Sequence, residues 1–289
     1  MNLPLDWNRD GHDWPHRDSS RFVHAAGLRW HVQIMGDGPT LLLVHGTGAA
    51  THSWRGLAPL LAEHFTVVAP DLPGHGFTHT LPYGAGSLPS MARALKQLLD
   101  VLALKPVGVI GHSAGAALLA RMCLDDLIQP QSLLSLNGAL LPLRGMPGVL
   151  FLPTARLLAV NPLIPRLFAW RASDQTALHR LISSTGSTLD AQGVALYQRL
   201  VSNPAHVAGV LTMMAQWDLR PLERDLPHLH TPTTLIIARN DRTLPPSEAL
   251  RIHALLPTAK RVFLAGVGHL AHEEQPRTVA DIVLAACKK

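Results

Sequence analysis

A Gly-His-Ser-Ala-Gly pentapeptide at residues 111–115 constrains the fold of this chain more than any other feature. The largely apolar run 105–110 precedes it, and the small, helix-forming residues 116–122 follow it. A serine between such segments occupies a sharp strand-to-helix turn, which strains its backbone and exposes its hydroxyl above a sheet. The flanking glycines fit this geometry, because a side chain at either would collide where the helix packs across the strand. The pattern therefore predicts that Ser113 is an exposed nucleophile.

Segments of strand and helix character alternate along most of the 289 residues. Strands are expected at 22–25, 28–35, 40–44, 65–69, 107–110, 133–136, 234–238 and 261–264, and helices at 54–63, 88–102, 247–255 and 276–286. Such alternation implies a mostly parallel sheet with helices on both faces. The alternation stops in a stretch rich in Pro, Arg, Leu and Met. We predict an α/β core of residues 1–139 and 223–289, with a helical cap inserted at 140–222.

Composition narrows the classes of protein that the chain can belong to. Hydrophobic residues make up 47% of it and charged residues 16%, which fits a large core and argues against disorder. The net charge of +5 comes from scattered arginines, whereas nucleic-acid binding needs a clustered basic patch, so no nucleic-acid partner is expected. Two distant cysteines exclude a disulfide framework and favour a reducing compartment.

The location of the protein is predicted from what its sequence lacks. Residues 1–20 have no apolar signal segment. No stretch offers about 18 uninterrupted apolar residues, so no spanning helix is expected. The sequence therefore predicts a cytoplasmic protein and leaves peripheral membrane contact open.

Ser113 needs a base to accept its proton, and that base needs a carboxylate to orient it. On this architecture the groups follow strand ends in the order Ser, acid, His. Asp241 follows one of the last two predicted strands, and His269, flanked by glycine, follows the other. The predicted catalytic residues are therefore Ser113, Asp241 and His269.

Each assignment has a plainer alternative. Asp241 follows Asn240, and an Asn-Asp pair is also typical of a turn; the competing acid position holds Asn137, which cannot carry the negative charge. With 17 histidines in the chain, any single one is more often a surface residue. His272 is read as a neighbour of the base, and Glu273 and Glu274 are expected to cap or solvate the next helix.

The reaction also needs donors for a developing oxyanion. The backbone N–H of Ala114, at the positive end of the helix after Ser113, is the first predicted donor. The second is the N–H of Thr47, in a loop whose neighbouring glycine permits close approach. Histidines show no ligand spacing with cysteines or paired carboxylates, and no phosphate-binding glycine loop is present. We predict no metal site and no cofactor.

Together, the motifs at 45–48, 71–76, 111–115, 240–241 and 268–269 resemble those of the α/β-hydrolase superfamily, from about residue 22 to 286. Haloalkane dehalogenases and epoxide hydrolases of that superfamily carry aspartate at the nucleophile position, so the serine disfavours those chemistries. Esterases, carbon–carbon bond hydrolases and cofactor-free haloperoxidase-like members remain.

A narrower resemblance covers nearly the whole chain. The stretches 5–11, 47–54, 136–140 and 213–219 are similar to the hydrolases of bacteriochlorophyll biosynthesis known as magnesium-chelatase accessory proteins. The resemblance implies a role near magnesium insertion into protoporphyrin, contact with magnesium chelatase, and a place near the photosynthetic membrane. It implies a pathway and leaves the reaction open.

The predicted cap is apolar and basic. Residues 127–173 contain no Asp or Glu, and their only charges are four arginines. One interpretation is an amphipathic cap whose arginines face water. A second is a lid for a flat apolar molecule with carboxylates, such as a protoporphyrin, since arginine both stacks and pairs with carboxylate; docking on an anionic membrane is compatible with it. Substrate-pocket residues are expected at Trp54, Met146, Phe151, Trp170, Met213 and Trp217.

Two functions follow from these patterns. The first is a serine hydrolase that cleaves an ester or similar bond of a bulky apolar substrate in (bacterio)chlorophyll biosynthesis. The second is a non-catalytic accessory protein that binds a porphyrin or supports magnesium chelatase. An intact triad favours the first, but a fold and a motif do not fix the substrate.

Overall fold

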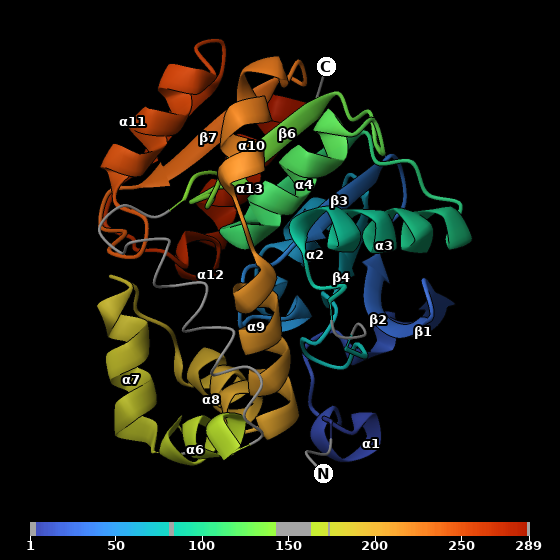
Figure 1. Cartoon of the computed structure of the whole chain (residues 1–289), viewed down its shortest axis with the longest axis vertical. Coiled ribbons are helices and arrows are strands. Elements are labelled where there is room, and N and C mark those ends of the chain that lie inside the picture. Colours follow the sequence, from blue (N-terminus) through green and yellow to red (C-terminus); the bar gives the residue numbers. More distant parts are fainter. Residues whose placement is uncertain (1–3, 81–83, 143–162, 173, 288–289) are drawn as a thin grey trace.

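The computed structural model describes residues 4–80, 84–142, 163–172 and 174–287, and Figure 1 shows their arrangement. The centre is an eight-stranded sheet with the order β1-β2-β4-β3-β5-β6-β7-β8. The β1–β2 and β2–β4 pairs are antiparallel, and every other neighbouring pair is parallel. The strands are β1 (Ser20–Ala25), β2 (Leu28–Met35), β3 (Thr40–Val44), β4 (Thr66–Pro70), β5 (Gly108–His112), β6 (Ser132–Leu136), β7 (Thr233–Ala238) and β8 (Lys260–Leu264). The predicted mostly parallel α/β sheet is confirmed.

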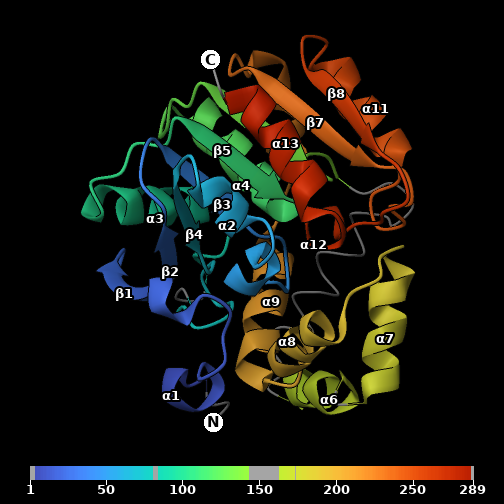
Figure 2. The ribbon, with the colours of Figure 1, turned by 180° about the vertical axis from the view of Figure 1, so that it is seen from behind.

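Helices cover both faces of this sheet. The described helices are α1 (Trp7–Asp10), α2 (Ala58–Ala62), α3 (Leu88–Val101), α4 (Ala114–Leu124), α6 (Leu163–Ala172), α7 (Gln175–Ser184), α8 (Ala191–Val201), α9 (Pro204–Gln216), α10 (Arg220–Asp225), α11 (Pro246–Leu255), α12 (Ala271–Glu274) and α13 (Pro276–Cys287). One core cluster joins the sheet to α3, α4, α10 and α11, and a second joins it to α2, α12 and α13. Figure 2 shows α13 and α2 on the side of the sheet opposite to α4.

The central strands are buried from both sides. In β3, Leu41 and Leu43 belong to the second cluster, whereas Leu42 and Val44 belong to the first. Successive side chains of a strand point to opposite faces, so an apolar run such as 41–44 is what a strand covered on both sides requires.

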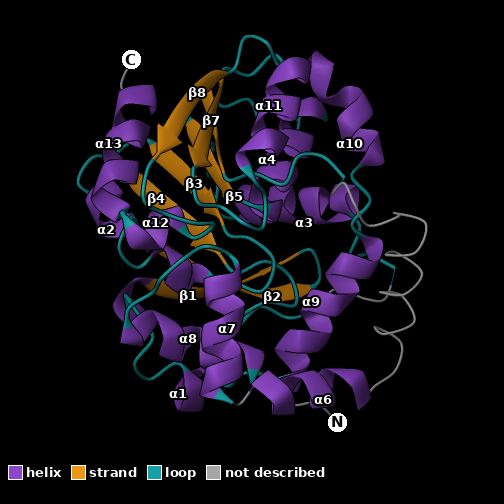
Figure 3. Cartoon of the chain, turned by 90° about the vertical axis from the view of Figure 1, so that its left-hand side faces the viewer, coloured by secondary structure: helices purple, strands orange, loops and turns teal. Residues whose placement is uncertain are grey.

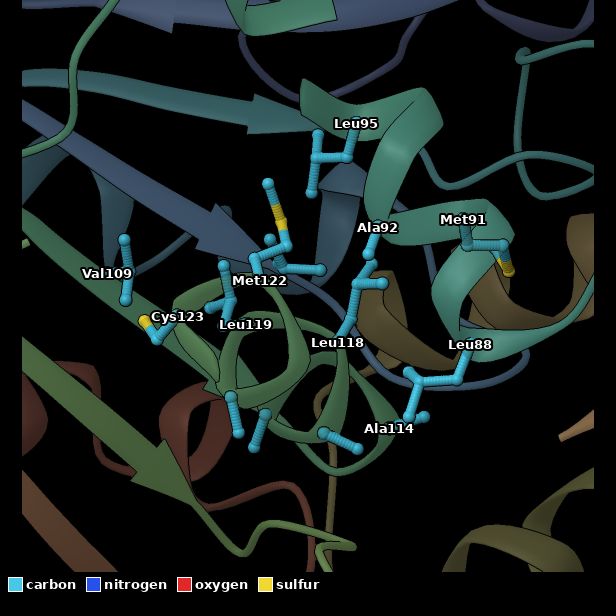
Figure 4. Close-up of a cluster of buried hydrophobic side chains, with 14 of the residues drawn as sticks. Leu88, Met91, Ala92, Leu95, Val109, Ala114, Leu118, Leu119, Met122 and Cys123 are labelled. Atoms are coloured by element: carbon cyan, nitrogen blue, oxygen red, sulfur yellow. The ribbon is translucent and has the colours of Figure 1, made fainter. Parts of the chain in front are cut away.

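Helix α4 is almost completely buried. Every residue from Ala114 to Cys123 is buried, and Figure 4 shows Leu118, Leu119 and Met122 in one cluster with Met91 and other residues of α3. Because Ser113 directly precedes this helix, the core fixes the position of the turn that carries it.

The predicted helix at 54–63 is shorter in the structure. A 3₁₀ turn spans Thr51–Trp54, and α2 begins only at Ala58. Pro59 lies at the start of α2. Proline lacks an N–H and is tolerated in the first turn of a helix but not in its interior, so the helix cannot extend back to residue 54.

Helices α6, α7, α8 and α9 form a group of their own between β6 and β7 in the chain. Figures 1 and 3 show this group on one side of the sheet, with α6 at the far end. All four helices lie within the predicted cap range, although Leu222 in α10 already packs with the sheet core. No helix in the described part of the chain combines the length and hydrophobicity that crossing a bilayer requires.

Candidate active site

Ser113 stands on a strained turn between β5 and α4. Its φ is 51° and its ψ is −117°, a conformation that non-glycine residues rarely adopt and that functional sites often retain. Three backbone hydrogen bonds hold it: its N–H donates to Leu136 (3.1 Å), and its carbonyl accepts from Ala116 (3.1 Å) and Ala139 (3.0 Å). The strain is therefore maintained by neighbours on both β6 and α4.

The glycines on either side of this turn have no room for a side chain. A Cβ on Gly111 would lie 2.3 Å from the Ala116 nitrogen, and one on Gly115 would lie 2.1 Å from the Val44 oxygen. Both contacts are with backbone atoms that cannot rotate away. The close packing of α4 across β3 and β5 thus depends on these glycines.

Asp241 and His269 form a buried hydrogen-bonded pair. Nδ1 of His269 lies 2.7 Å from Oδ2 of Asp241, and the two side chains are 8% and 1% exposed. Oδ1 of Asp241 accepts from the N–H groups of Thr243 and Leu244, both at 2.8 Å. Because the carboxylate only accepts, Nδ1 of His269 must carry the proton, which leaves Nε2 able to act as a base.

The side chains of His112 and Asn137 join the Ser113 turn to the backbone of the His269 loop. His112 donates from Nε2 to the His269 carbonyl at 2.9 Å, and their rings lie 4.8 Å apart. Asn137 donates to the carbonyls of Gly268 (3.2 Å) and His269 (2.9 Å) and accepts from the Ala238 N–H (2.8 Å). Among the described residues, the Ser113 hydroxyl makes no hydrogen bond to His269.

The Gly46–Thr47 peptide has a fixed orientation beside Ser113. The Gly46 carbonyl accepts from Nδ1 of His45 (2.8 Å) and from the Ala49 N–H (3.2 Å), while Nε2 of His45 accepts from the Leu72 N–H (2.9 Å). In a planar trans peptide the N–H points opposite to the carbonyl, so these bonds also fix the direction of the Thr47 N–H. A Cβ on Gly46 would lie 2.9 Å from the Cβ of Ser113, which brings this loop against the turn.

A buried aspartate holds the neighbouring loop. Asp71 accepts from Nδ1 of His31 (2.8 Å) and from the N–H groups of Thr51 (2.7 Å) and Phe77 (2.9 Å). Burial alone would raise the pKa of this carboxyl, but His31 and these hydrogen bonds hold the pKa well below its usual value. Gly76 has to lack a side chain, because its Cβ would lie 2.1 Å from Asp71 Oδ2.

The loop between α7 and α8 contacts the Asp241 and His269 loops together. The Thr185 carbonyl accepts from the N–H groups of Arg242 (3.1 Å) and His269 (3.3 Å), and the Ser187 hydroxyl accepts from the Leu270 N–H (2.8 Å). A Cβ on Gly268 would lie 2.2 Å from the backbone of Gly186. Sequence reasoning missed these residues, because nothing local marks a contact between segments that lie 57 to 84 positions apart in the chain.

The expectation that Glu273 is a solvated or helix-capping residue is wrong. Its side chain is fully buried, forms an ion pair with Arg55, and accepts from the Tyr197 hydroxyl (2.9 Å). Burial raises the pKa of Glu273 to about 7, against the opposing effect of Arg55. Glu274 accepts from the N–H groups of Gly268 (2.9 Å) and Thr188 (3.1 Å). Both carboxylates therefore tie the His269 loop to α8 and its preceding loop.

The predicted pocket residues lie in different surroundings. Trp54 and Met213 are buried in the two core clusters, and Trp217 packs partly buried against the first. Trp170 on α6 is 72% exposed. Met146 and Phe151 lie outside the described residues. Within the described ranges, no group of three His, Cys, Asp or Glu side chains is placed to hold a metal ion.

The chain is similar to known proteins along almost its full length. It is 36% identical over 274 residues to the magnesium-chelatase 30 kDa subunit of Rhodobacter capsulatus, covering 94% of this chain and 95% of that one. It is 28% identical over 281 residues to the 2-hydroxy-6-oxo-2,4-heptadienoate hydrolase of Pseudomonas putida, covering 91% and 94%. An α/β-hydrolase fold protein of Burkholderia ambifaria superimposes with a TM-score of 0.78 at 23% identity, over 99% of this chain and 100% of that one.

The family model of the alpha/beta hydrolase fold matches residues 39–276. That range contains the Ser113 turn, the Asp241–His269 pair and the 46–48 loop. The chain therefore belongs to the α/β-hydrolase family.

Proposed function

We propose that this protein is a serine hydrolase that cleaves an ester or similar acyl bond of a bulky apolar substrate. The observation that carries the proposal is the buried 2.7 Å bond between His269 and Asp241, on a loop joined to the strained turn of Ser113. That combination of a nucleophile, a base and a carboxylate to orient the base defines this class of chemistry by geometry and role.

The reaction starts with attack of the Ser113 hydroxyl on the substrate carbonyl, while Nε2 of His269 accepts the hydroxyl proton. Asp241 keeps His269 in the tautomer that leaves Nε2 free, and stabilises the imidazolium that forms. The N–H groups of Ala114 and Thr47 stabilise the oxyanion. His269 then donates its proton to the leaving alcohol, and water hydrolyses the acyl-enzyme by the same steps.

The proposed substrate is an ester-bearing side chain of a porphyrin in (bacterio)chlorophyll biosynthesis. Support comes from the similarity to the Rhodobacter capsulatus magnesium-chelatase subunit and from the composition of the predicted cap (residues 140–222). Its described part includes Arg166, Arg171 and Trp170 on α6, and arginine and tryptophan suit a flat apolar ligand with carboxylates. The same similarity supports a second candidate, an accessory role that needs magnesium-chelatase contact or porphyrin binding but no chemistry.

We also propose peripheral contact of α6 with an anionic membrane. The orientation of this helix supports it, since the small residues Pro165 and Ala169 are buried while Leu167, Phe168 and Trp170 are 57%, 50% and 72% exposed. Arg166 and Arg171 are exposed beside them. Large apolar, aromatic and basic residues on one exposed surface are typical of helices that lie in the membrane interface.

The decisive experiment treats the purified protein with a fluorophosphonate probe. We expect covalent labelling of Ser113, no labelling of Ser113→Ala, and normal labelling of the control Ser247→Ala, whose serine is exposed on α11. Competition by a magnesium-porphyrin methyl ester would support the proposed substrate class. A folded wild-type protein that the probe does not label would refute the proposed serine hydrolase activity.

A genetic test separates the two candidate functions. In a strain that lacks the chromosomal copy, Ser113→Ala should fail to restore pigment if catalysis is required. Restoration to the wild-type level by Ser113→Ala, at equal protein abundance, would support the accessory role instead.

A further inference from the structure

We infer that His206, on helix α9 of the predicted cap, is a positioning residue for the oxyanion loop, residues 46–48. The inference rests on the proposed function, because it assigns the 46–48 loop a role in stabilising the oxyanion. It makes the cap a part of the catalytic machinery rather than a separate cover.

The two ring nitrogens of His206 connect two loops of the sheet domain. Nδ1 accepts from the Gly76 N–H at 3.1 Å, and Nε2 faces the Gly48 carbonyl at 3.3 Å. Because a backbone N–H can only donate and a carbonyl can only accept, the ring has to be the neutral tautomer with its proton on Nε2. His206 is 4% exposed, and burial lowers its pKa to about 4, so this tautomer persists at neutral pH.

Helix α9, which carries His206, is held by a cap at its N-terminus and by close packing against the 71–76 loop. The Asn203 side chain caps α9 by accepting from the N–H groups of Ala205 and His206, both at 3.0 Å. One turn further on, a Cβ on Gly209 would lie 2.1 Å from the Gly74 carbonyl oxygen. Residues three apart share a helix face, so the backbone of α9 rests directly on the 71–76 loop beside His206.

His206 and His45 hold the oxyanion loop from two sides. His45 binds the Gly46 carbonyl from the sheet domain, and His206 binds the Gly48 carbonyl from the cap. The ring of His75 lies between them, 5.4 Å from each. The predicted donor, the Thr47 N–H, therefore lies between two carbonyls that are each held by a buried histidine.

Gly48 is the position in the loop where this support matters most. Its φ is 79°, and a Cβ there would meet nothing within 4 Å, so no side chain restricts its backbone torsions. Without the bond from His206, the Gly48 carbonyl loses its tie to the cap, and only the His45 and Ala49 bonds to the Gly46 carbonyl keep the Thr47 N–H directed at the reacting carbonyl. Loss of an oxyanion donor lowers kcat by about 10²–10³-fold, and a loosened donor should cost less than that.

Two variants of His206 test the inference by kinetics with a p-nitrophenyl ester. His206→Phe keeps a ring but removes both hydrogen bonds, and we expect kcat to fall by about tenfold or more while KM changes less than about threefold. His206→Gln keeps one acceptor and one donor and should recover part of kcat. His179→Phe, at an exposed histidine on α7, is the matched control and should behave as wild type. A folded His206→Phe variant with wild-type kcat, or with only KM raised, would overturn the inference.

A second measurement does not depend on activity. Long-range ¹H–¹⁵N spectra of the wild-type protein with ¹⁵N-labelled histidine, with His206 assigned by the peak missing from His206→Phe, should show the Nε2–H tautomer at pH 7. The Nδ1–H tautomer or a protonated ring would overturn the positioning role. A wild-type protein that hydrolyses no ester and takes no fluorophosphonate would refute the proposed function, while the tautomer would still decide whether His206 holds the loop.

Discussion

His112 donates a hydrogen bond from Nε2 to the backbone carbonyl of His269, across 2.9 Å and 157 positions of sequence. The residue that precedes the predicted nucleophile thus holds the backbone of the predicted base. Asn137 donates to the same carbonyl, also at 2.9 Å. The position of the His269 ring relative to Ser113 therefore depends on side chains from the ends of β5 and β6.

Asn137→Ala should impair both stability and hydrolysis. It removes two donors from the carbonyls of Gly268 and His269 and the acceptor of the Ala238 N–H. The His269 carbonyl keeps its bond from His112, whereas the Gly268 carbonyl and the Ala238 N–H lose the bonds that Asn137 makes. Unsatisfied buried groups cost about 1–3 kcal/mol each, so the free energy of unfolding should fall by about 2–6 kcal/mol. Urea unfolding and kcat with a p-nitrophenyl ester measure the two effects. Asn8→Ala, at an exposed position in α1, is the control; an Asn137→Ala variant as stable as that control would contradict the prediction.

Asp241→Asn should abolish most activity with little change in the fold. The amide can still accept at one atom, but its NH₂ group favours the wrong tautomer of His269, and loss of the equivalent carboxylate lowers kcat by about 10⁴-fold in a well-characterised triad. The rate of covalent labelling by the fluorophosphonate probe, followed over time, measures this loss. Asp281→Asn, exposed on α13, should label as wild type. Labelling of Asp241→Asn within tenfold of the wild-type rate would show that Asp241 does not orient the base.

Acidification should destabilise the protein below about pH 6.5, through its buried histidines. The centroid of the His272 ring lies 4.6 Å from that of Trp54 and 4.5 Å from that of His112. Neither nitrogen of this ring has a hydrogen-bond partner among the described residues. Burial, with nearby His269 and Arg55, lowers the pKa of His272 to about 3. Between pH 6.5 and 3 the unfolded chain binds a proton that the native ring does not, so stability falls as the pH falls.

His272→Leu should reduce the loss of stability that acidification causes, because it removes one buried neutral histidine. At pH 5.5, one unit below the unfolded pKa, each neutral buried histidine costs about 1.4 kcal/mol. The loss in unfolding free energy between pH 8 and 5.5 should therefore be smaller by this amount in His272→Leu than in wild type. Urea titrations at the two pH values measure the difference. An unchanged loss would mean that His272 becomes protonated in the native protein.

Membrane binding through α6 should depend on its exposed apolar side chains. The double variant Leu167→Ser/Trp170→Ser should lower binding to phosphatidylcholine–phosphatidylglycerol vesicles by about tenfold or more, because each large apolar side chain that is buried contributes about 1.5–3 kcal/mol. Flotation with vesicles measures the bound fraction. Leu250→Ser, at an exposed leucine of α11, is the control. Equal flotation of the double variant and wild type would exclude α6 as the contact.

The sequence predicted the parts of this protein that local rules govern. The apolar run before Gly111 and the small residues after Gly115 form one continuous segment. The strand, turn and helix around Ser113 could therefore be predicted without the rest of the chain, and the lack of room for a Cβ at either glycine agrees with that prediction. Asp241 and His269 were predicted for the same reason, since each directly follows a recognisable strand. The burial of Glu273 could not be predicted, because Arg55 lies 218 positions away.

The order of strands in the sheet and the attachment of the cap were decided only by the tertiary structure. Nothing in the residues of β4 states that it lies between β2 and β3, and nothing around His206 states that it bridges Gly48 and Gly76. Backbone propensity and apolar periodicity act over a few residues, whereas these contacts arise from the packing of whole elements, whose energies are summed over many distant side chains. The sequence therefore determined which groups could perform chemistry, and the packed fold determined which other groups hold them in place.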